Sequence, residues 1–380
     1  MLEWRTVVRR LGEAFAARAA EHDENDRFVS ANWAELKNEK LFSAMVPVEL
    51  GGAGLPHAEM CALIRELAQN CSSTALAFSM HQHLVAAAVW NYRRGNPGEK
   101  LLRKVTDGEN VLVSTGANDW LSSSGSLEPC EGGFRFSATK AFASGCPSGD
   151  LLMTSGRFHD PARGWQVLHF PLSLSSDGVR IEENWKAMGM RGSGSNSVVL
   201  DRVFVPAESI AVRRPIGVYH RVWDVVLTVA MPLVSAVYLG LAEASARQAL
   251  DAVRSRGDDG VTPVLLGELE NELTTARLAF DSMVAIANNL DFEPSPQKSS
   301  DMLVRKTILT QAVVRTTTKA LEVVGGSGYI RTRGLERLLR DSYAGQFHPL
   351  PPKKQQRFTG RLAMGLEPTA DESSHVTSRD

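Results

Sequence analysis

The chain has 380 residues, of which 43% are hydrophobic and 22% are charged, and its formal net charge is -1. A chain of this length can bury a large core in two or three domains, and the composition excludes a disordered or fibrous protein. The balanced charge provides no overall basic field that would attract nucleic acid or an anionic membrane. The four cysteines form no C-x-x-C pair and are too few for a disulfide framework. We therefore expect a cytoplasmic protein, and because we find no signal-peptide core and no apolar run of about 18 residues, we expect no membrane span.

Apolar residues recur at helical spacing from residue 5 to about residue 103, as at Leu63 and Leu67. This pattern predicts an N-terminal α-helical domain over residues 1–108. In the following segment, short β-prone runs alternate with Gly, Ser, Asn and Pro, which is typical of strands joined by turns. They predict a middle β-domain of barrel-like form over residues 109–213.

The helical period returns in three long segments between residues 225 and 324. In the first of them, Leu233 and Gly240 belong to a wide apolar stripe with small residues that permit close helix packing. We predict a C-terminal four-helix bundle over residues 214–366, so the predicted fold class is α+β. Residues 367–380 are polar and are predicted to form a disordered tail.

Motifs for metal binding, nucleotide binding or hydrolysis are weak or absent. His81 and His83 lie two residues apart, and on a helix such side chains point about 200° apart, so they cannot share one metal ion. We interpret both as structural histidines. The sequence contains no G-x-x-x-x-G-K-[ST], no strand-linked G-x-G-x-x-G and no G-x-S-x-G, which excludes a P-loop, a Rossmann site and a nucleophile elbow.

The strongest local signal is a glycine turn late in the chain. Residues 321–329 read Leu-Glu-Val-Val-Gly-Gly-Ser-Gly-Tyr, a helix-forming run that stops at Gly325 and Gly326. Because glycine has no Cβ, a ligand can approach the bare backbone at such a turn. We therefore expect cofactor contact here.

Several spaced motifs occur in a characteristic order. Residues 45–55 read Met-Val-Pro-Val-Glu-Leu-Gly-Gly-Ala-Gly-Leu, residues 140–145 read Lys-Ala-Phe-Ala-Ser-Gly, residues 188–193 read Met-Gly-Met-Arg-Gly-Ser, and residues 203–206 read Val-Phe-Val-Pro. With the glycine turn, the later Arg-Asp pair and the order of helical, β and helical domains, they resemble the acyl-CoA dehydrogenase superfamily from about residue 28 to residue 365.

The resemblance implies a flavoprotein, usually a homotetramer, with the flavin between the β-domain and the C-terminal helices. FAD is the implied cofactor, with FMN or a reduced flavin as alternatives. Phe142 would lie against the flavin ring, Ser144 would bond its redox edge, and the pair Gly325 and Gly326 would admit the pyrophosphate. Thr115 is a weaker cofactor candidate, because it alone remains of the family's Thr-Glu-Pro stretch.

The catalytic base departs from the family pattern. Dehydrogenation needs a base that removes the α-proton, and many relatives place a Glu after the Arg-Asp pair, where this chain has Pro349. Other relatives place a carboxylate on the long helix, eight residues before a proline, and here that position is Asp224. An alternative interpretation is that Asp224 is only an acidic residue at the N-terminus of a helix, where the helix dipole stabilises negative charge. Dibenzothiophene-type monooxygenases of the same fold carry a histidine at the spacing that His348 has from Arg340, and an imidazole can act as base or acid. The alternative interpretation is that His348 is a structural histidine at a helix boundary before a proline.

The segment that reaches toward FAD from a neighbouring subunit also differs. The family pattern is Arg-x-x-Phe-Gly, whereas residues 254–263 read Arg-Ser-Arg-Gly-Asp-Asp-Gly-Val-Thr-Pro. Arg256 is the candidate to keep part of the cofactor-binding role. The loss of the Phe leaves room for FMN or for a loosely held reduced flavin.

Three functions remain open, and the sequence favours the first. It is a dehydrogenase that oxidises an acyl-CoA or acyl-carrier-protein thioester at Cα–Cβ, with Asp224 or His348 as base and an electron-transfer flavoprotein as acceptor. The second is a monooxygenase that uses reduced flavin from a flavin reductase, with His348 handling protons and Ser144 positioning the flavin. The third is a catalytically degenerate flavin-fold protein that serves as a binding or assembly partner.

Overall fold

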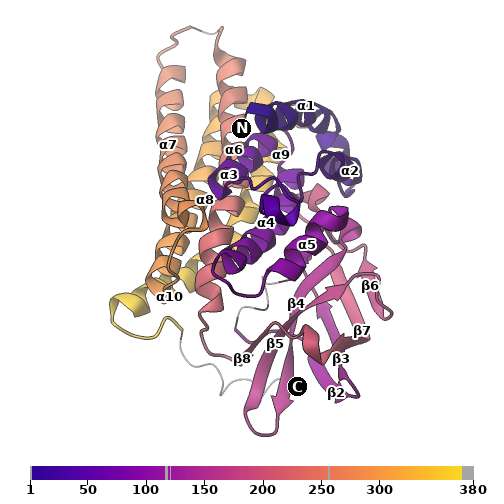
Figure 1. The fold of residues 1–380 in the computed structure, drawn as a ribbon. Coiled ribbons are helices and arrows are strands. Elements are labelled where there is room, and N and C mark those ends of the chain that lie inside the picture. The colour runs from indigo at the N-terminus through magenta and orange to yellow at the C-terminus, as the bar shows by residue number, and fades with distance from the viewer. Residues whose placement is uncertain (1, 116–118, 120, 256, 370–380) are drawn as a thin grey trace.

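The computed structural model describes residues 2–115, 119, 121–255 and 257–369. Helices come first, strands follow, and helices return (Figure 1). The first group of helices comprises α1 (Leu2–Glu24), α2 (Ser30–Asn38), α3 (His57–Ala68), α4 (Ser72–Arg93) and α5 (Glu99–Gly108). The predicted tail lies outside the described residues from residue 370 onward.

The strands form one mixed sheet of eight. They are β1 (Leu112–Ser114), β2 (Ser126–Cys130), β3 (Gly133–Lys140), β4 (Leu151–Asp160), β5 (Gly164–Ser173), β6 (Val179–Glu182), β7 (Ser197–Pro206) and β8 (Val212–Pro215). Their order is β6-β7-β3-β2-β4-β5-β8, and β1 runs parallel to one end of β4. Since no pairing of described residues joins β6 to β8, the predicted barrel-like form is an open sheet.

The C-terminal helices are α6 (Val222–Val253), α7 (Thr262–Ala287), α8 (Pro296–Val324), α9 (Leu335–Ser342) and α10 (Pro352–Ala363). The three long helices α6, α7 and α8 pack against one another, and α9 and α10 both pack against α8. The structure thus has the helical, β and helical order that the sequence predicts (Figure 1).

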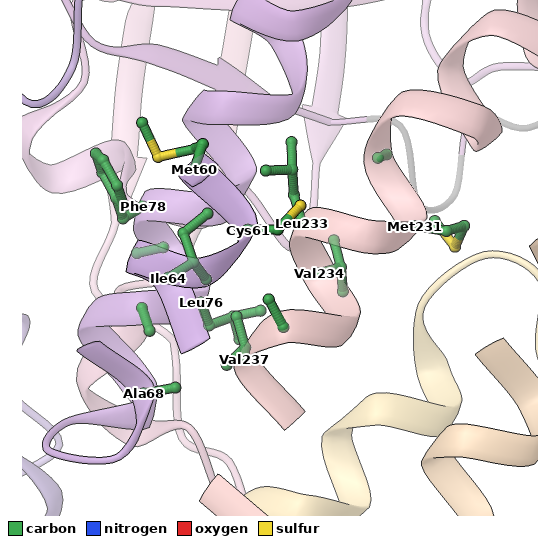
Figure 2. Close-up of a cluster of buried hydrophobic side chains, with 14 of the residues drawn as sticks. Met60, Cys61, Ile64, Ala68, Leu76, Phe78, Met231, Leu233, Val234 and Val237 are labelled. Carbon is green, nitrogen blue, oxygen red and sulfur yellow. The ribbon is translucent and has the colours of Figure 1, made fainter. Parts of the chain in front are cut away.

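Helix α6 is the central element of the core. It packs against α3 and α4 as well as α7 and α8, and Figure 2 shows its Leu233, Val234 and Val237 in one apolar cluster with Cys61 and Ile64 of α3. The two backbones approach closely, since a Cβ on Gly240 would lie 2.2 Å from the carbonyl oxygen of Arg65. Any larger residue there would push α6 away from α3.

The apolar character of α6 corrects one expectation. Within the described residues, this is the one helix long and apolar enough to cross a membrane, with a mean hydropathy of 2.2 over an 18-residue window. The expectation that no such run exists was therefore wrong. Because 94% of that window is buried inside the protein, the run has the burial of a core helix surrounded by other helices.

Candidate active site

A cavity of about 220 Å³ lies between the sheet and helices α4 and α6. More than half of its wall is apolar, and the polar groups are hydroxyls, imidazoles and one carboxyl group. The lining residues are His83, Leu84, Ser114, Thr115, Asp119, Met153, Thr154, Ser155, His169, Phe170, Pro171, Ala211, Val212, Val222, Trp223 and Val226. A mostly apolar pocket with a few polar groups is the usual form of a small-molecule site.

His83 is a site residue that the sequence reasoning missed. It lines the cavity, and burial lowers its pKa to about 4, so the ring is neutral at pH 7. His81 points elsewhere: its Nε2 lies 2.9 Å from the carbonyl oxygen of Phe42, and its Nδ1 accepts from the amide of Leu112. The two rings therefore diverge as their spacing predicts, and within the described residues no cluster of three metal-ligating side chains occurs.

His348 lies in the segment after α9, beside the central helix. Its Nε2 is 2.7 Å from the hydroxyl oxygen of Tyr238 on α6. Burial, and to a smaller extent the neighbouring Lys306 and His83, lower the pKa of His348 to about 3.

Asp224 lies in the first turn of α6 and does not line the cavity. Its Oδ1 accepts hydrogen bonds from the hydroxyl groups of Tyr219, at 2.5 Å, and Ser299, at 2.6 Å. Burial raises the pKa of this carboxyl group. Both hydroxyl groups thus bind the Asp224 carboxylate outside the cavity, whereas the side chain of its neighbour Trp223 lines the cavity wall.

We expect Asp224→Asn to fold and to retain most of its activity, since an amide oxygen can still accept both hydroxyl hydrogens. In the wild type, the folded state binds more protons than the unfolded state between the ordinary carboxyl pKa and the raised one. The free energy of unfolding therefore falls as the pH rises through this window. Thermal melts from acid to neutral pH should show a flatter dependence in the variant. A hundredfold loss of turnover would instead identify Asp224 as the catalytic base.

Phe142 and Ser144 lie on the loop that follows β3. The Phe142 ring is 49% exposed, and its edge meets Trp185 with centroids 5.9 Å apart. The Ser144 hydroxyl is 2.7 Å from that of Ser195, which in turn is 2.7 Å from that of Ser193. An exposed aromatic ring next to a chain of hydroxyl groups fits a planar, polar-edged ring such as a flavin.

The remaining cofactor candidates lie in different places. Thr115 lines the cavity and donates to the Thr154 hydroxyl at 2.9 Å. Gly325 and Gly326 begin the turn after α8, and a Cβ on either would meet no atom within 4 Å. Their backbone is therefore open to a ligand, and the φ of +73° at Gly325 favours glycine. Arg256 lies outside the described residues.

Replacing Ser144 with alanine should weaken flavin binding more than it lowers stability. The change removes one hydrogen bond to Ser195, which contributes about 1 kcal/mol to folding, and also the group predicted to bond the redox edge of the flavin. Flavin fluorescence quenching and thermal melts measure the two effects. Ser193→Ala is the matched control, because it shortens the same hydroxyl chain at its far end. Equal flavin affinity in both variants would contradict this role of Ser144.

Comparison with known proteins identifies the family. The acyl-CoA dehydrogenase N-terminal domain matches residues 2–109, and the acyl-CoA dehydrogenase C-terminal domain matches residues 233–350. The chain belongs to the acyl-CoA dehydrogenase superfamily, as the sequence motifs indicate, and it is a flavoenzyme of that fold.

Its relatives include nitrososynthases as well as a dehydrogenase. L-evernosamine nitrososynthase of a Micromonospora species is 29% identical over 90% of this chain and 86% of its own. Amino sugar nitrososynthase DnmZ of Streptomyces peucetius is 27% identical over 91% and 90%. Cyclohex-1-ene-1-carbonyl-CoA dehydrogenase of Syntrophus aciditrophicus is 24% identical over 93% and 87%.

Among solved structures, KijD3 in complex with dTDP superposes with a TM-score of 0.86 at 25% identity, covering 96% of this chain and 97% of that one. KijD3 in complex with FMN and a dTDP-linked amino sugar superposes with a TM-score of 0.87 at 24% identity, covering 98% and 96%. These similarities confirm the predicted fold class over nearly the whole chain.

Proposed function

We propose that this chain is a monooxygenase that uses reduced flavin to oxygenate a nucleophilic nitrogen of a small substrate. The observation that carries this proposal is the polar part of the cavity wall. Among the described residues that line the cavity, the one carboxylate is that of Asp119. It accepts hydrogen bonds from the Lys140 ammonium at 2.5 Å and from the Ser124 hydroxyl at 3.0 Å. A dehydrogenase needs a free base beside the substrate α-carbon, and this wall offers neutral imidazole instead.

The other carboxylate positions lead to the same conclusion. Pro349 stands where many family members have the catalytic Glu, and Asp224 is engaged by two hydroxyl groups away from the cavity wall. The imidazoles of the cavity wall are those of His83 and His169. His348, which is bonded to Tyr238 and does not itself line the cavity, is the further group that can handle protons. We therefore rank the oxygenase, the second function that the sequence leaves open, above the dehydrogenase.

The environment of the histidines suits an amine substrate. Burial lowers the pKa of His83 to about 4, because a buried and mostly apolar environment disfavours the charged form. The same effect lowers the pKa of a bound amine, so the amine binds neutral and keeps its nitrogen lone pair free. Each neutral imidazole can then donate one hydrogen bond and accept another.

A bound reduced flavin supplies the two electrons with which one atom of dioxygen is transferred to the substrate and the other leaves as water. The residues of this chain that would hold it are Phe142, Ser144 and the glycine turn at Gly325. Tyr238 orients His348 through their hydrogen bond, and His348 would exchange protons with the reacting nitrogen. The nitrososynthase relatives, and the dTDP-linked amino sugar bound to KijD3, support an amino sugar on a nucleotide carrier as the substrate.

The test is an assay of the purified chain with FMN or FAD, a flavin reductase with NADH, and a dTDP-linked amino sugar. The proposal expects oxygen uptake that depends on reductase and sugar, together with a product heavier by one oxygen atom per transfer. A parallel anaerobic assay adds an acyl-CoA to the flavin-loaded protein. Bleaching of the flavin by the thioester, with no oxygenated sugar, would favour the dehydrogenase.

A further inference from the structure

The segment 346–350, which carries His348, is held by a single side chain from α8. Lys306 is 1% exposed, and its Nζ lies 3.3 Å from the carbonyl oxygen of Gln346, 2.8 Å from that of His348 and 3.2 Å from that of Leu350. A protonated lysine has three N–H donors. Its three hydrogens match these three carbonyl groups, whereas a neutral amine would have only two donors.

In its protonated form, Lys306 has no counter-ion in the described part of the chain. Among the described residues, no carboxylate forms a salt bridge with it, and burial lowers its pKa to about 7. Burying an unpaired ammonium is unfavourable, and an apolar side chain of similar length would fill the same space.

The residue directly before this segment, Gly345, packs closely on both α8 and α6. A Cβ on Gly345 would lie 2.9 Å from Cγ2 of Thr310 and 3.2 Å from Cδ1 of Tyr238. Besides Lys306, the titratable groups around His348 are Tyr238 on α6 and His83 on α4, while Asp341 on α9 acts on Tyr238. The imidazole is thus held between the Tyr238 hydroxyl and a backbone held by the ammonium.

We propose that Lys306 is the positioning residue of His348: its ammonium binds three carbonyl groups of the 346–350 segment and so fixes the place of the imidazole. The contribution of this clamp to catalysis rests on the proposed function, whereas the clamp itself does not. The charge acts in two ways, through the carbonyl bonds and through repulsion of an imidazolium.

The test observes His348 directly, by NMR of the full chain with 15N-labelled histidine, both with and without FMN. His348→Asn assigns the signal. In Lys306→Met we expect the His348 nitrogen shifts to change and its pKa to rise by about one unit or more, because the neighbouring positive charge is gone. Lys306→Arg, which keeps the charge, should stay near wild type. Lys298→Met is the matched control, because Lys298 also lies on α8 and donates to a backbone carbonyl, that of Glu293.

An unchanged His348 signal in a folded Lys306→Met chain would overturn the proposal. If that variant does not fold, the wild type decides the question: the His348 nitrogens should shift as the Lys306 side-chain carbon titrates near pH 7, and constant shifts through that titration would overturn it. The His348 signals thus judge the clamp, while the oxygenase rate of His348→Asn judges the proposed function. The two failures can therefore be told apart.

Discussion

His348→Asn is expected to lower the rate of substrate oxygenation by about 10²- to 10⁴-fold, the usual contribution of a group that transfers protons. Stability should change little, because the main loss is one hydrogen bond to Tyr238, worth about 1 kcal/mol. Product formation and oxygen uptake are measured separately with the reductase present. Product formation gives the rate, and its ratio to oxygen uptake shows how well oxygen consumption is coupled to oxygenation of the substrate. We expect oxygen uptake to continue without matching product.

Tyr238→Phe is the control for this experiment. It removes the hydroxyl partner but keeps the imidazole, so the rate should fall by less than in His348→Asn. A nearly normal rate in His348→Asn would mean that the histidine only closes the segment before α10. If Asp224→Asn then abolished turnover, the base would lie on α6 and the dehydrogenase would be the better interpretation.

The second large effect is expected for Asp119→Asn. The side chains of Asp119 and Lys140 are 4% and 1% exposed and their charged atoms are 2.5 Å apart, so the change leaves a buried ammonium without a counter-ion. Removing one partner of such a pair costs about 3–5 kcal/mol of stability. Urea unfolding measures this loss, and a value under about 1 kcal/mol would show that the pair behaves as a surface ion pair.

The stability of Asp119→Asn should depend on pH in a direction that follows from the pKa of Lys140. Burial already lowers the pKa of Lys140, and the charge of Asp119 opposes that shift. Without the aspartate, the folded state binds fewer protons than the unfolded state, so the stability of the variant should rise with pH as the lysine loses its proton. The double variant Asp119→Asn with Lys140→Met should regain much of the stability, because it removes the unpaired charge altogether.

The sequence by itself determined the order of the elements and the family. The change from a helical to a strand period and back marks the β-segment, and the spaced motifs around Phe142, Gly189 and Gly325 indicate the superfamily, which the comparisons confirm. It also predicts that Pro349 stands where many relatives carry the catalytic Glu. These features are local, so they can be predicted without knowing which surfaces meet.

Only the tertiary structure decided which side chains share the cavity. Helices α4 and α6 are buried on nearly every side, so they have no polar face that would show from sequence how they are turned. For this reason the sequence could not separate His83, which faces the cavity, from His81, which bonds the backbone of Phe42.

The same reason applies to the surroundings of His348. Lys306 and Tyr238 are 42 and 110 positions away from it in the chain, and no local pattern connects them. The packing of α6 and α8 brings the ammonium and the hydroxyl to one short segment, while it places Asp224 beside Tyr219 and Ser299. The sequence supplied the candidate residues, and the packing of buried helices decided their partners, because long-range contacts depend on how whole faces fit together.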